Sequence, residues 1–284
     1  MDRIINRRQA LASFSTLGLG AVLAACGNGG GDDAAATTTG AGAGPDTTAG
    51  PNAGATTAVD AAGSSAAGAT TSTTSADQAG AGAVTASMFD DAAACTLTAE
   101  QTEGPFYFDV ESLRRDIRED RQGSRLRLGI RVRDAAACAP LPGAVVDIWH
   151  CDALGLYSGF EAASTGAGGG GFGGGPTDSE TFLRGAQVAD ADGIVEFVTI
   201  YPGWYRGRTA HIHAKVHLDN STALTTQLYF DDEFTEAVYT TEPYASAGGR
   251  DTFNDNDGIF DEGLVLTLSE DGDGSLGLVT FDVT

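Results

Sequence analysis

The chain has 284 residues, of which 42% are hydrophobic and 8% aromatic, and its formal net charge at pH 7 is −23. This acidic excess argues against nucleic-acid binding, because phosphates require a basic face, and against electrostatic docking on anionic lipid. The length allows one or two domains.

Residues 1–26 have the features of an export signal. Arg7 and Arg8 form a twin-arginine pair ahead of an apolar stretch, Leu11 to Ala25, that is too short for a comfortable membrane span. The stretch ends in "LAAC", which matches a bacterial lipobox with Cys26 as the residue that receives lipid. An ordinary cleaved signal that contains a cysteine is the alternative. We expect an exported protein, either secreted or held at the outer face of the membrane only through that lipid.

Residues 27–90 are of low complexity. Up to Ser87 they consist almost entirely of Ala, Gly, Thr, Ser and Asp, with no aromatic residue. Such a segment cannot bury enough apolar surface to offset the entropy lost on ordering. An Ala-rich helix is disfavoured because Gly and Thr interrupt every run. We therefore predict a disordered linker.

Residues 91–284 contain short strand candidates separated by Gly- and Pro-containing turns. Arg125 to Asp134 alternates charged and apolar residues, which is typical of a half-buried strand. The other strand candidates lie within 143–152, 193–201, 209–218, 224–230 and 264–283. Residues 111–120 are the only helix candidate and could equally form a loop, and residues 166–175 form a Gly-rich insertion. This pattern predicts an all-β fold, a single β-sandwich domain of mostly antiparallel strands.

Three cysteines remain if Cys26 carries lipid. Cys138 and Cys151 flank the strand expected at 144–150, and at about 3.3 Å per residue they would lie too far apart to pair. Cys95 is therefore the expected disulfide partner of one of them. The sequence leaves open which one.

The segment Thr199 to Val216, "TIYPGWYRGRTAHIHAKV", contains a His-x-His pair. On a strand His211 and His213 point to the same face and could share one metal ion. Such a pair alone is more often a surface feature or part of a polar core. However, Tyr205 follows a Pro-Gly turn nearby, and Tyr157 follows a Gly-containing turn after another expected strand. Two phenolates and two imidazoles suit Fe(III) better than Zn(II) or Ca(II).

Four blocks of the sequence resemble the intradiol ring-cleavage dioxygenases. They are "QTEGPFY" (101–107), "PLPGAVVDIWHCDALGLYS" (140–158), "FLRGAQVADADGIVEFVTIYPGWYRGRTAHIHAKV" (182–216) and "LTTQLYF" (224–230). The resemblance covers about residues 100–230 and extends loosely to the end. It implies a mononuclear non-haem Fe(III) site with Tyr157 and His211 as equatorial ligands and Tyr205 and His213 as axial ligands.

The same resemblance implies that the partners are a catechol-type aromatic molecule and O2, which give a cis,cis-muconate-type diacid. The implied catalytic residues are Arg208, Tyr205 and Gln227. Thr209 stands where the family usually has proline, which bears on the rigidity of the loop rather than on the ligands. The helical N-terminal domain that mediates dimerisation in well-known catechol-cleaving members is replaced here by the linker, so the oligomeric state stays open.

Several residues near these motifs favour ordinary structural roles. Thr102, Gly104, Pro105 and Tyr107 belong to a block that lines the substrate cleft in the family, but the sequence alone favours a turn before the first strand. His150 is expected to be a core or rim histidine rather than a ligand.

Two further residues and three alternative functions stay open. Arg184 and Gln187 either support the site from behind or simply lie in a strand. The alternatives are an exported β-sandwich binding module without catalysis, a zinc-dependent hydrolase that uses His211 and His213 with a carboxylate, and a structural surface lipoprotein. Metal content distinguishes them.

Overall fold

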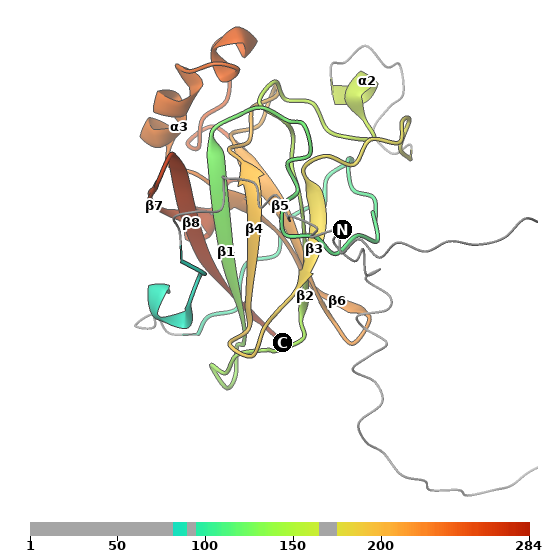
Figure 1. Cartoon of the computed structure of the whole chain (residues 1–284), viewed down its shortest axis with the longest axis vertical. Coiled ribbons are helices and arrows are strands. Elements are labelled where there is room, and N and C mark those ends of the chain that lie inside the picture. The colour runs from blue at the N-terminus through green and yellow to red at the C-terminus, as the bar shows by residue number, and fades with distance from the viewer. Residues whose placement is uncertain (1–81, 90–94, 165–174) are drawn as a thin grey trace, which may run out of the picture. The chain divides into compact units, whose positions relative to one another are not determined.

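The computed structural model describes residues 82–89, 95–164 and 175–284. The predicted signal with Cys26, residues 27–81 of the predicted linker and residues 166–174 of the Gly-rich insertion lie outside the described residues. The strands are β1 (Arg125–Asp134), β2 (Val145–Trp149), β3 (Arg184–Val188), β4 (Ile194–Ile200), β5 (His211–Leu218), β6 (Ser221–Tyr229), β7 (Thr267–Asp271) and β8 (Gly274–Val283). They form two four-stranded sheets in the orders β4-β1-β8-β7 and β3-β2-β5-β6 (Figure 1). Neighbouring strands are antiparallel except for β1 and β8, which are parallel. The predicted all-β sandwich is confirmed.

The two sheets bury a common core between them. On β5 the residues that contribute to this core are Ile212, Ala214 and Val216, all of which are fully buried. Because side chains alternate along a strand, His211 and His213 point to the opposite face of the sheet. The alternation of the sequence thus places both imidazoles on the outer face of the β3-β2-β5-β6 sheet.

The N-terminal part of the described domain covers this outer face. The backbone N–H of Gln101 donates to the carbonyl of Thr225 at the free edge of β6 (2.8 Å). The chain then crosses the outer face, where a Cβ atom at Gly104 would lie 3.1 Å from the His213 ring and the Tyr107 ring lies 4.7 Å from that of Trp149. The histidines on β5 are consequently buried although they lie outside the main core.

Strand β1 differs from its predicted half-buried state, because its charged face is buried as well. Arg127 donates to Glu196 on β4 (2.8 Å) and to Asp271 on β7 (3.0 Å). Satisfying the charge in this way allows an arginine to be buried within a sheet. The sequence shows the alternation but not the carboxylates that neighbouring strands supply.

Residues 82–89 provide the cover over that charged face. Val84 and Phe89 are buried in a small cluster with residues of β4 and β8. The guanidinium of Arg131 lies 5.0 Å from the centre of the Phe89 ring. Packed residues therefore extend to the N-terminal side of residue 91, where the domain was predicted to begin.

Helix α3 (Asp232–Tyr239) was not predicted from the sequence. It begins after Asp231, whose side chain accepts from the Phe234 amide (2.9 Å) and caps the helix. The candidate helix at 111–120 is instead a loop that makes isolated bridges to β3 and β4. The remaining helical segments are short: η2 (Ala86–Met88), α2 (Glu161–Ser164), η3 (Tyr244–Ala247) and η4 (Glu262–Leu264). Among the described residues, no helix is long and apolar enough to cross a membrane.

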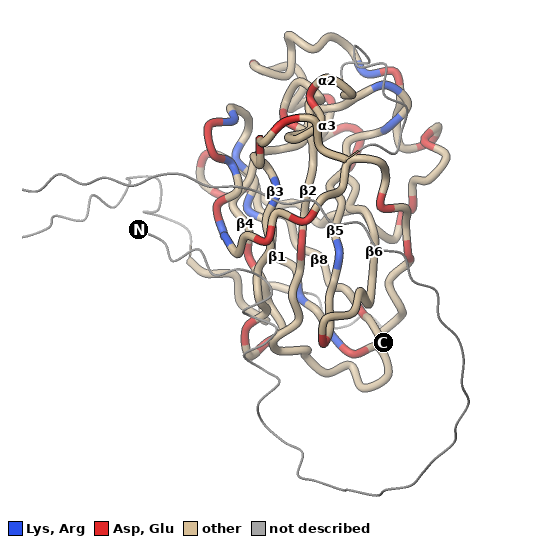
Figure 2. The backbone as a smooth tube through the Cα atoms, turned by 90° about the vertical axis from the view of Figure 1, so that its right-hand side faces the viewer, with Lys and Arg blue, Asp and Glu red and all other residues tan. Residues whose placement is uncertain are grey.

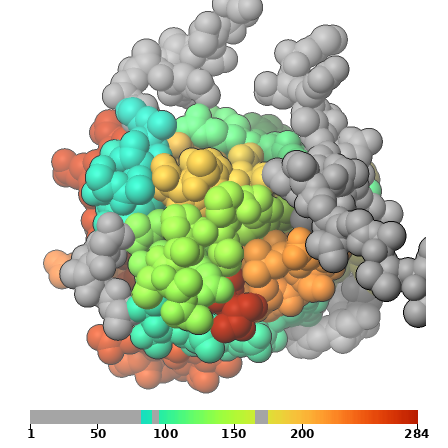
Figure 3. Space-filling model, turned by 90° about the horizontal axis from the view of Figure 1, so that it is seen from below, coloured from blue at the N-terminus to red at the C-terminus, as the bar shows by residue number. Residues whose placement is uncertain are grey.

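Helices α2 and α3 lie at one end of the strands, and the C-terminus lies at the other (Figure 1). At the latter end, the turn between β1 and β2 lies beside the C-terminus and the β5–β6 turn (Figure 3). Cys138 in that turn forms a disulfide with Cys95, which settles the open question of pairing, and Cys151 is free and buried. Acidic positions recur in loops at both ends of the strands (Figure 2).

Candidate metal centre

Strand β5 sets the positions of both histidines, whose ring centres are 4.8 Å apart. The Nδ1–H of His211 donates to the carbonyl of Thr209 (2.7 Å). Since a neutral imidazole carries one proton, this bond leaves Nε2 as the atom with a free lone pair. The Nε2 atom of His211 is therefore oriented as a potential metal ligand.

The second imidazole is held by stacking. The ring of His213 lies almost parallel to that of Trp149 on β2, with a centre-to-centre distance of 4.8 Å and an interplanar angle of 6°. A Cβ atom at Gly104 would lie 3.1 Å from Cε1 of His213, and Gly104 has a φ of +71°. Glycine thus allows the covering segment to approach the imidazole closely. Within the described structure, the buried Nδ1 atom of His213 has no hydrogen-bond partner.

The two tyrosines reach the histidines from different loops. The Tyr157 hydroxyl, after β2, lies 3.4 Å from Nε2 of His211, and the Tyr205 hydroxyl, after β4, lies 3.1 Å from the same atom. Gly155 has a φ of +83°, and a Cβ there would lie only 2.4 Å from the carbonyl oxygen of Trp204. The two loops are therefore in direct contact at a position that only glycine can occupy.

The two tyrosine side chains differ in exposure. Tyr157 is fully buried and packs on Phe106, with ring centres 4.8 Å apart, whereas Tyr205 is half-buried. Tyr201, the other tyrosine of this segment, points elsewhere and hydrogen bonds with the Thr235 hydroxyl (2.8 Å). The structure thus brings together the four residues that the sequence singled out as candidate ligands.

Burial keeps these four groups uncharged in the absence of a metal. It raises the pKa of Tyr157 well above its ordinary value and that of Tyr205 to about 12, although the nearby Arg208 opposes the shift for Tyr205. Burial also lowers the pKa of His211 to about 3 and that of His213 well below its usual range. Neutral imidazoles are the form that binds metals, and a hard trivalent cation favours ionised phenols. The donor set therefore fits Fe(III).

In the part of the chain that the structure describes, no carboxylate joins His211 and His213 in a candidate metal site. In residues 82–89, 95–164 and 175–284, no group of three or more His, Cys, Asp or Glu side chains could hold a metal ion.

His150 hydrogen bonds with the Cys151 carbonyl (2.8 Å) and the Thr199 hydroxyl (2.7 Å). It is a buried core histidine, as the sequence predicted.

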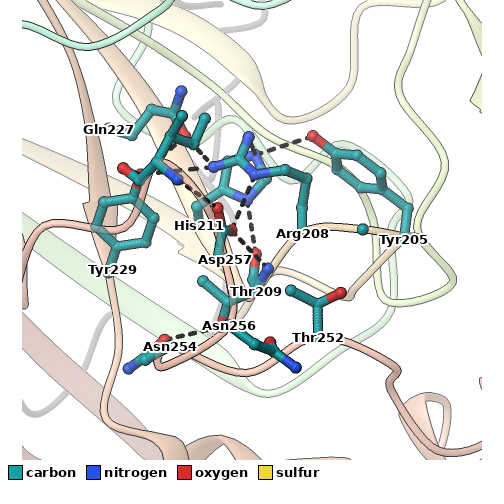
Figure 4. A network of polar contacts seen from close by, with 12 residues as sticks. Tyr205, Arg208, Thr209, His211, Gln227, Tyr229, Thr252, Asn254, Asn256 and Asp257 are labelled. Carbon is teal, nitrogen blue, oxygen red and sulfur yellow. Dashed lines mark hydrogen bonds and ion pairs between the residues drawn. The ribbon is translucent and has the colours of Figure 1, made fainter.

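A network of polar contacts surrounds the centre on one side (Figure 4). Arg208 Nη1 lies 3.5 Å from His211 Nε2, and its Nη2 donates to Gln227 Oε1 (2.5 Å). Gln227 in turn donates to the carbonyl of Thr102 (2.9 Å). Arg208 and Gln227, the two predicted catalytic residues that are not also candidate ligands, therefore lie next to the four candidate ligands.

The structure corrects the interpretation of residues 102–107 as a simple turn. Gly104 contacts His213, Phe106 packs on Tyr157, and the ammonium of Lys215 lies 3.7 Å from the centre of the Tyr107 ring. This segment borders the site because it crosses the outer face of the sheet, a long-range placement that local turn signals do not reveal.

Arg184 lies in β3, and it also supports the site. Its buried guanidinium donates to the Ser158 hydroxyl (2.8 Å) and carbonyl (2.7 Å), and it lies 6.0 Å from the centre of the Tyr157 ring.

Two further residues of the network, Tyr229 and Asp257, were missed by sequence reasoning. The tyrosine falls in the "LTTQLYF" block, which is a usable signal, but nothing local marks Asp257.

Comparison with known proteins agrees with this geometry. A family model described as "Dioxygenase" matches residues 102–282. A solved intradiol ring-cleavage dioxygenase from Tetranychus urticae is 31% identical with a TM-score of 0.62, and the match covers 67% of this chain and 95% of that one. This chain belongs to the intradiol ring-cleavage dioxygenases.

The matches to curated relatives cover a smaller share of both chains. A chlorocatechol 1,2-dioxygenase of Rhodococcus opacus is 30% identical over 161 residues, or 48% of this chain and 57% of the relative. A catechol 1,2-dioxygenase of Pseudomonas sp. (strain EST1001) is 30% identical over 182 residues, or 54% of this chain and 55% of the relative. This intradiol dioxygenase thus spans little more than half the length of the curated relatives it matches.

Proposed function

We propose that the chain is an Fe(III)-dependent intradiol dioxygenase that uses O2 to cleave the ring of a catechol-type substrate between its two hydroxylated carbons. The product is a cis,cis-muconate-type diacid. The observation that carries this proposal is the convergence of two tyrosine hydroxyls on His211, with His213 and a guanidinium beside them. The names of the relatives support the substrate class.

Tyr157, Tyr205, His211 and His213 would hold the iron. When bound, Fe(III) supplies Lewis acidity, which favours loss of the protons from the two catechol hydroxyls. Tyr205 is the ligand on the more exposed loop, whereas Tyr157 is fully buried. Tyr205 is accordingly the group that can move aside for substrate and take up one of its protons.

Arg208 acts on the substrate ring. Loss of both hydroxyl protons gives the catechol dianion carbanion character at a ring carbon, which O2 then attacks, and a fixed guanidinium stabilises that negative charge without needing to reorganise. Gln227 accepts from Nη2 of Arg208 and is itself held by the carbonyl of Thr102. Gln227 therefore orients the guanidinium.

The experiment that tests this function combines metal analysis, visible spectroscopy and oxygen uptake on a panel of catechols. The purified protein should contain iron, show the red-brown colour of tyrosinate-to-Fe(III) charge transfer, and form the muconate-type diacid. Tyr157→Phe and His211→Ala should lose iron and colour, whereas Arg208→Ala should keep the colour and lose most turnover. Zinc in place of iron, or an iron-free colourless protein, would reject the proposal.

We also propose that the protein is exported and anchored by lipid on Cys26. The Cys95–Cys138 disulfide supports export, because disulfides persist mainly outside the reducing cytoplasm. Mass spectrometry of the mature N-terminus tests the anchor, and Cys26→Ser should release the protein from the membrane fraction. Recovery of the unprocessed signal on an active cytoplasmic protein would contradict it.

A further inference from the structure

A buried carboxylate from the C-terminal part of the chain holds Arg208. Asp257 lies in the loop between η3 and η4, and its side chain is 1% exposed. One oxygen, Oδ2, accepts from Nε of Arg208 (2.9 Å) and from the backbone N–H of Thr209 (2.9 Å). The other, Oδ1, accepts from the N–H of Ile259 (3.0 Å). The carboxylate thus joins its own loop to two consecutive residues at the metal centre.

These contacts define the direction of the guanidinium. Nε of Arg208 is bound by Asp257, and Nη2 is bound by Gln227 on β6 (2.5 Å). A guanidinium is planar, so two anchors on different edges fix its orientation. The remaining nitrogen, Nη1, is left 3.5 Å from Nε2 of His211, on the side of the candidate ligands (Figure 4).

Thr209 strengthens the same connection. Its backbone N–H reaches Asp257, and its hydroxyl donates to Oδ1 of Asn254 (2.8 Å) in the same loop. A proline at position 209 would have no N–H to donate. Thr209, which departs from the usual family pattern, therefore joins Arg208 in fastening the 250–260 loop to the site.

The charge on Asp257 is secured by its surroundings. Burial raises the pKa of this carboxyl, but the backbone N–H groups of Thr209 and Ile259, together with Arg208, outweigh burial and lower it. The ion pair with Arg208 is formally neutral. Its contribution to the site is therefore the direction of the guanidinium rather than additional charge.

We propose that Asp257, assisted by Thr209, is a positioning residue for Arg208 that keeps Nη1 directed at the ring carbon where negative charge develops. The proposal rests on the function proposed above. Loss of the contact between Asp257 and Arg208 should leave the iron ligands in place but let the guanidinium rotate away. A displacement of about 1 Å of a catalytic group can cost about 100-fold in rate.

The test is Asp257→Asn in the full protein, with Asp255→Asn as the matched control, since Asp255 is an exposed aspartate of the same loop. Asp257→Asn should keep its iron and colour while kcat and kcat/KM fall together by up to about 100-fold. The control should stay within about 2-fold of the unchanged protein, as an exposed surface change does. An Asp257→Asn variant with full activity overturns the proposal.

A double-variant measurement separates positioning from general structure. If Asp257 acts only through Arg208, adding Asp257→Asn to Arg208→Ala should cause no further loss of kcat, whereas independent effects would multiply. Multiplying losses overturn the proposal. Arg208→Lys provides a test that does not depend on the folding of an Asp257 variant. The lysine keeps the positive charge but lacks the Nε–H group from which Asp257 accepts a hydrogen bond. Full activity in this variant therefore also counts against the proposal.

A measurement on the metal-free protein distinguishes this proposal from the proposed function. The Nε–H proton of Arg208 should exchange slowly with water and give an NMR signal. This signal should be present in the Asp255→Asn control and lost in Asp257→Asn. If the unchanged protein consumes no O2 with any catechol, the proposed function fails, and this signal still reports on the anchor. If O2 is consumed but the signal does not depend on Asp257, only the positioning role fails.

Discussion

Gly155→Ala tests whether the contact between the two tyrosine-bearing loops holds the metal centre together. Gly155 has a φ of +83°, and an alanine Cβ would lie 2.4 Å from the carbonyl oxygen of Trp204, next to Tyr205. The left-handed backbone costs a non-glycine residue about 1–2 kcal/mol, and the overlap with a backbone atom adds about 1–3 kcal/mol. The loops must separate, which moves the Tyr157 and Tyr205 hydroxyls apart.

The assay is urea unfolding of the metal-free protein, together with the iron content after loading. Gly207→Ala is the matched control, because Gly207 has a φ of +82° but its Cβ would meet no atom within 4 Å. The control should lose only the backbone contribution and keep its iron. Gly155→Ala should lose more stability than the control and also bind iron more weakly. Equal stability losses, with iron binding intact in both variants, would refute the idea that this close contact sets the site.

Three further predictions concern the framework around the site. Replacing Cys95 and Cys138 by serine should lower the free energy of unfolding by about 4 kcal/mol, as loop-closure entropy predicts for a sequence separation of 43, and an unchanged urea midpoint would argue otherwise. Burial raises the pKa of Glu196, but hydrogen bonds and charge from Arg127 and Arg115 outweigh burial and lower it. The ionised Glu196 therefore stabilises the fold above pH about 4.3, and this contribution is lost as the pH falls through the folded-state pKa. Glu196→Gln should make the free energy of unfolding depend less steeply on pH in acid. Deleting residues 27–78 should leave kcat unchanged, whereas extending the deletion to residue 89 also removes the buried side chains of the small cluster and should cost about 1.5–3 kcal/mol for each large apolar one.

Local pattern was enough to predict the elements on which the site stands. Strand β1 was predicted with its observed ends, because charged and apolar residues alternate at the period of a strand. His211 and His213 had to share a face for the same reason, since the pleat repeats every two residues. The blocks around Tyr157 and Tyr205 carried enough specific residues to indicate the family.

Other features have no local signal, because they depend on segments distant in the sequence. The choice of Cys138 over Cys151 as partner of Cys95 is made by the turn that lies beside the C-terminus. Burial of the charged face of β1 depends on carboxylates of β4 and β7. Helix α3 was missed because its capping signal is a single aspartate in an acidic run.

The sequence by itself determined most of the strands and the faces of their side chains, since these follow from backbone geometry within short segments, and its resemblance to the family indicated the candidate ligands. Strand β3 (Arg184–Val188) was not among the predicted strands. Tertiary structure alone decided that Gly104 lies against His213 and that Asp257 holds Arg208. Such contacts join residues 109 and 49 positions apart, as their numbering shows. They form only when the chain packs, because a short-range periodicity carries no information about which distant loop will cover a given face.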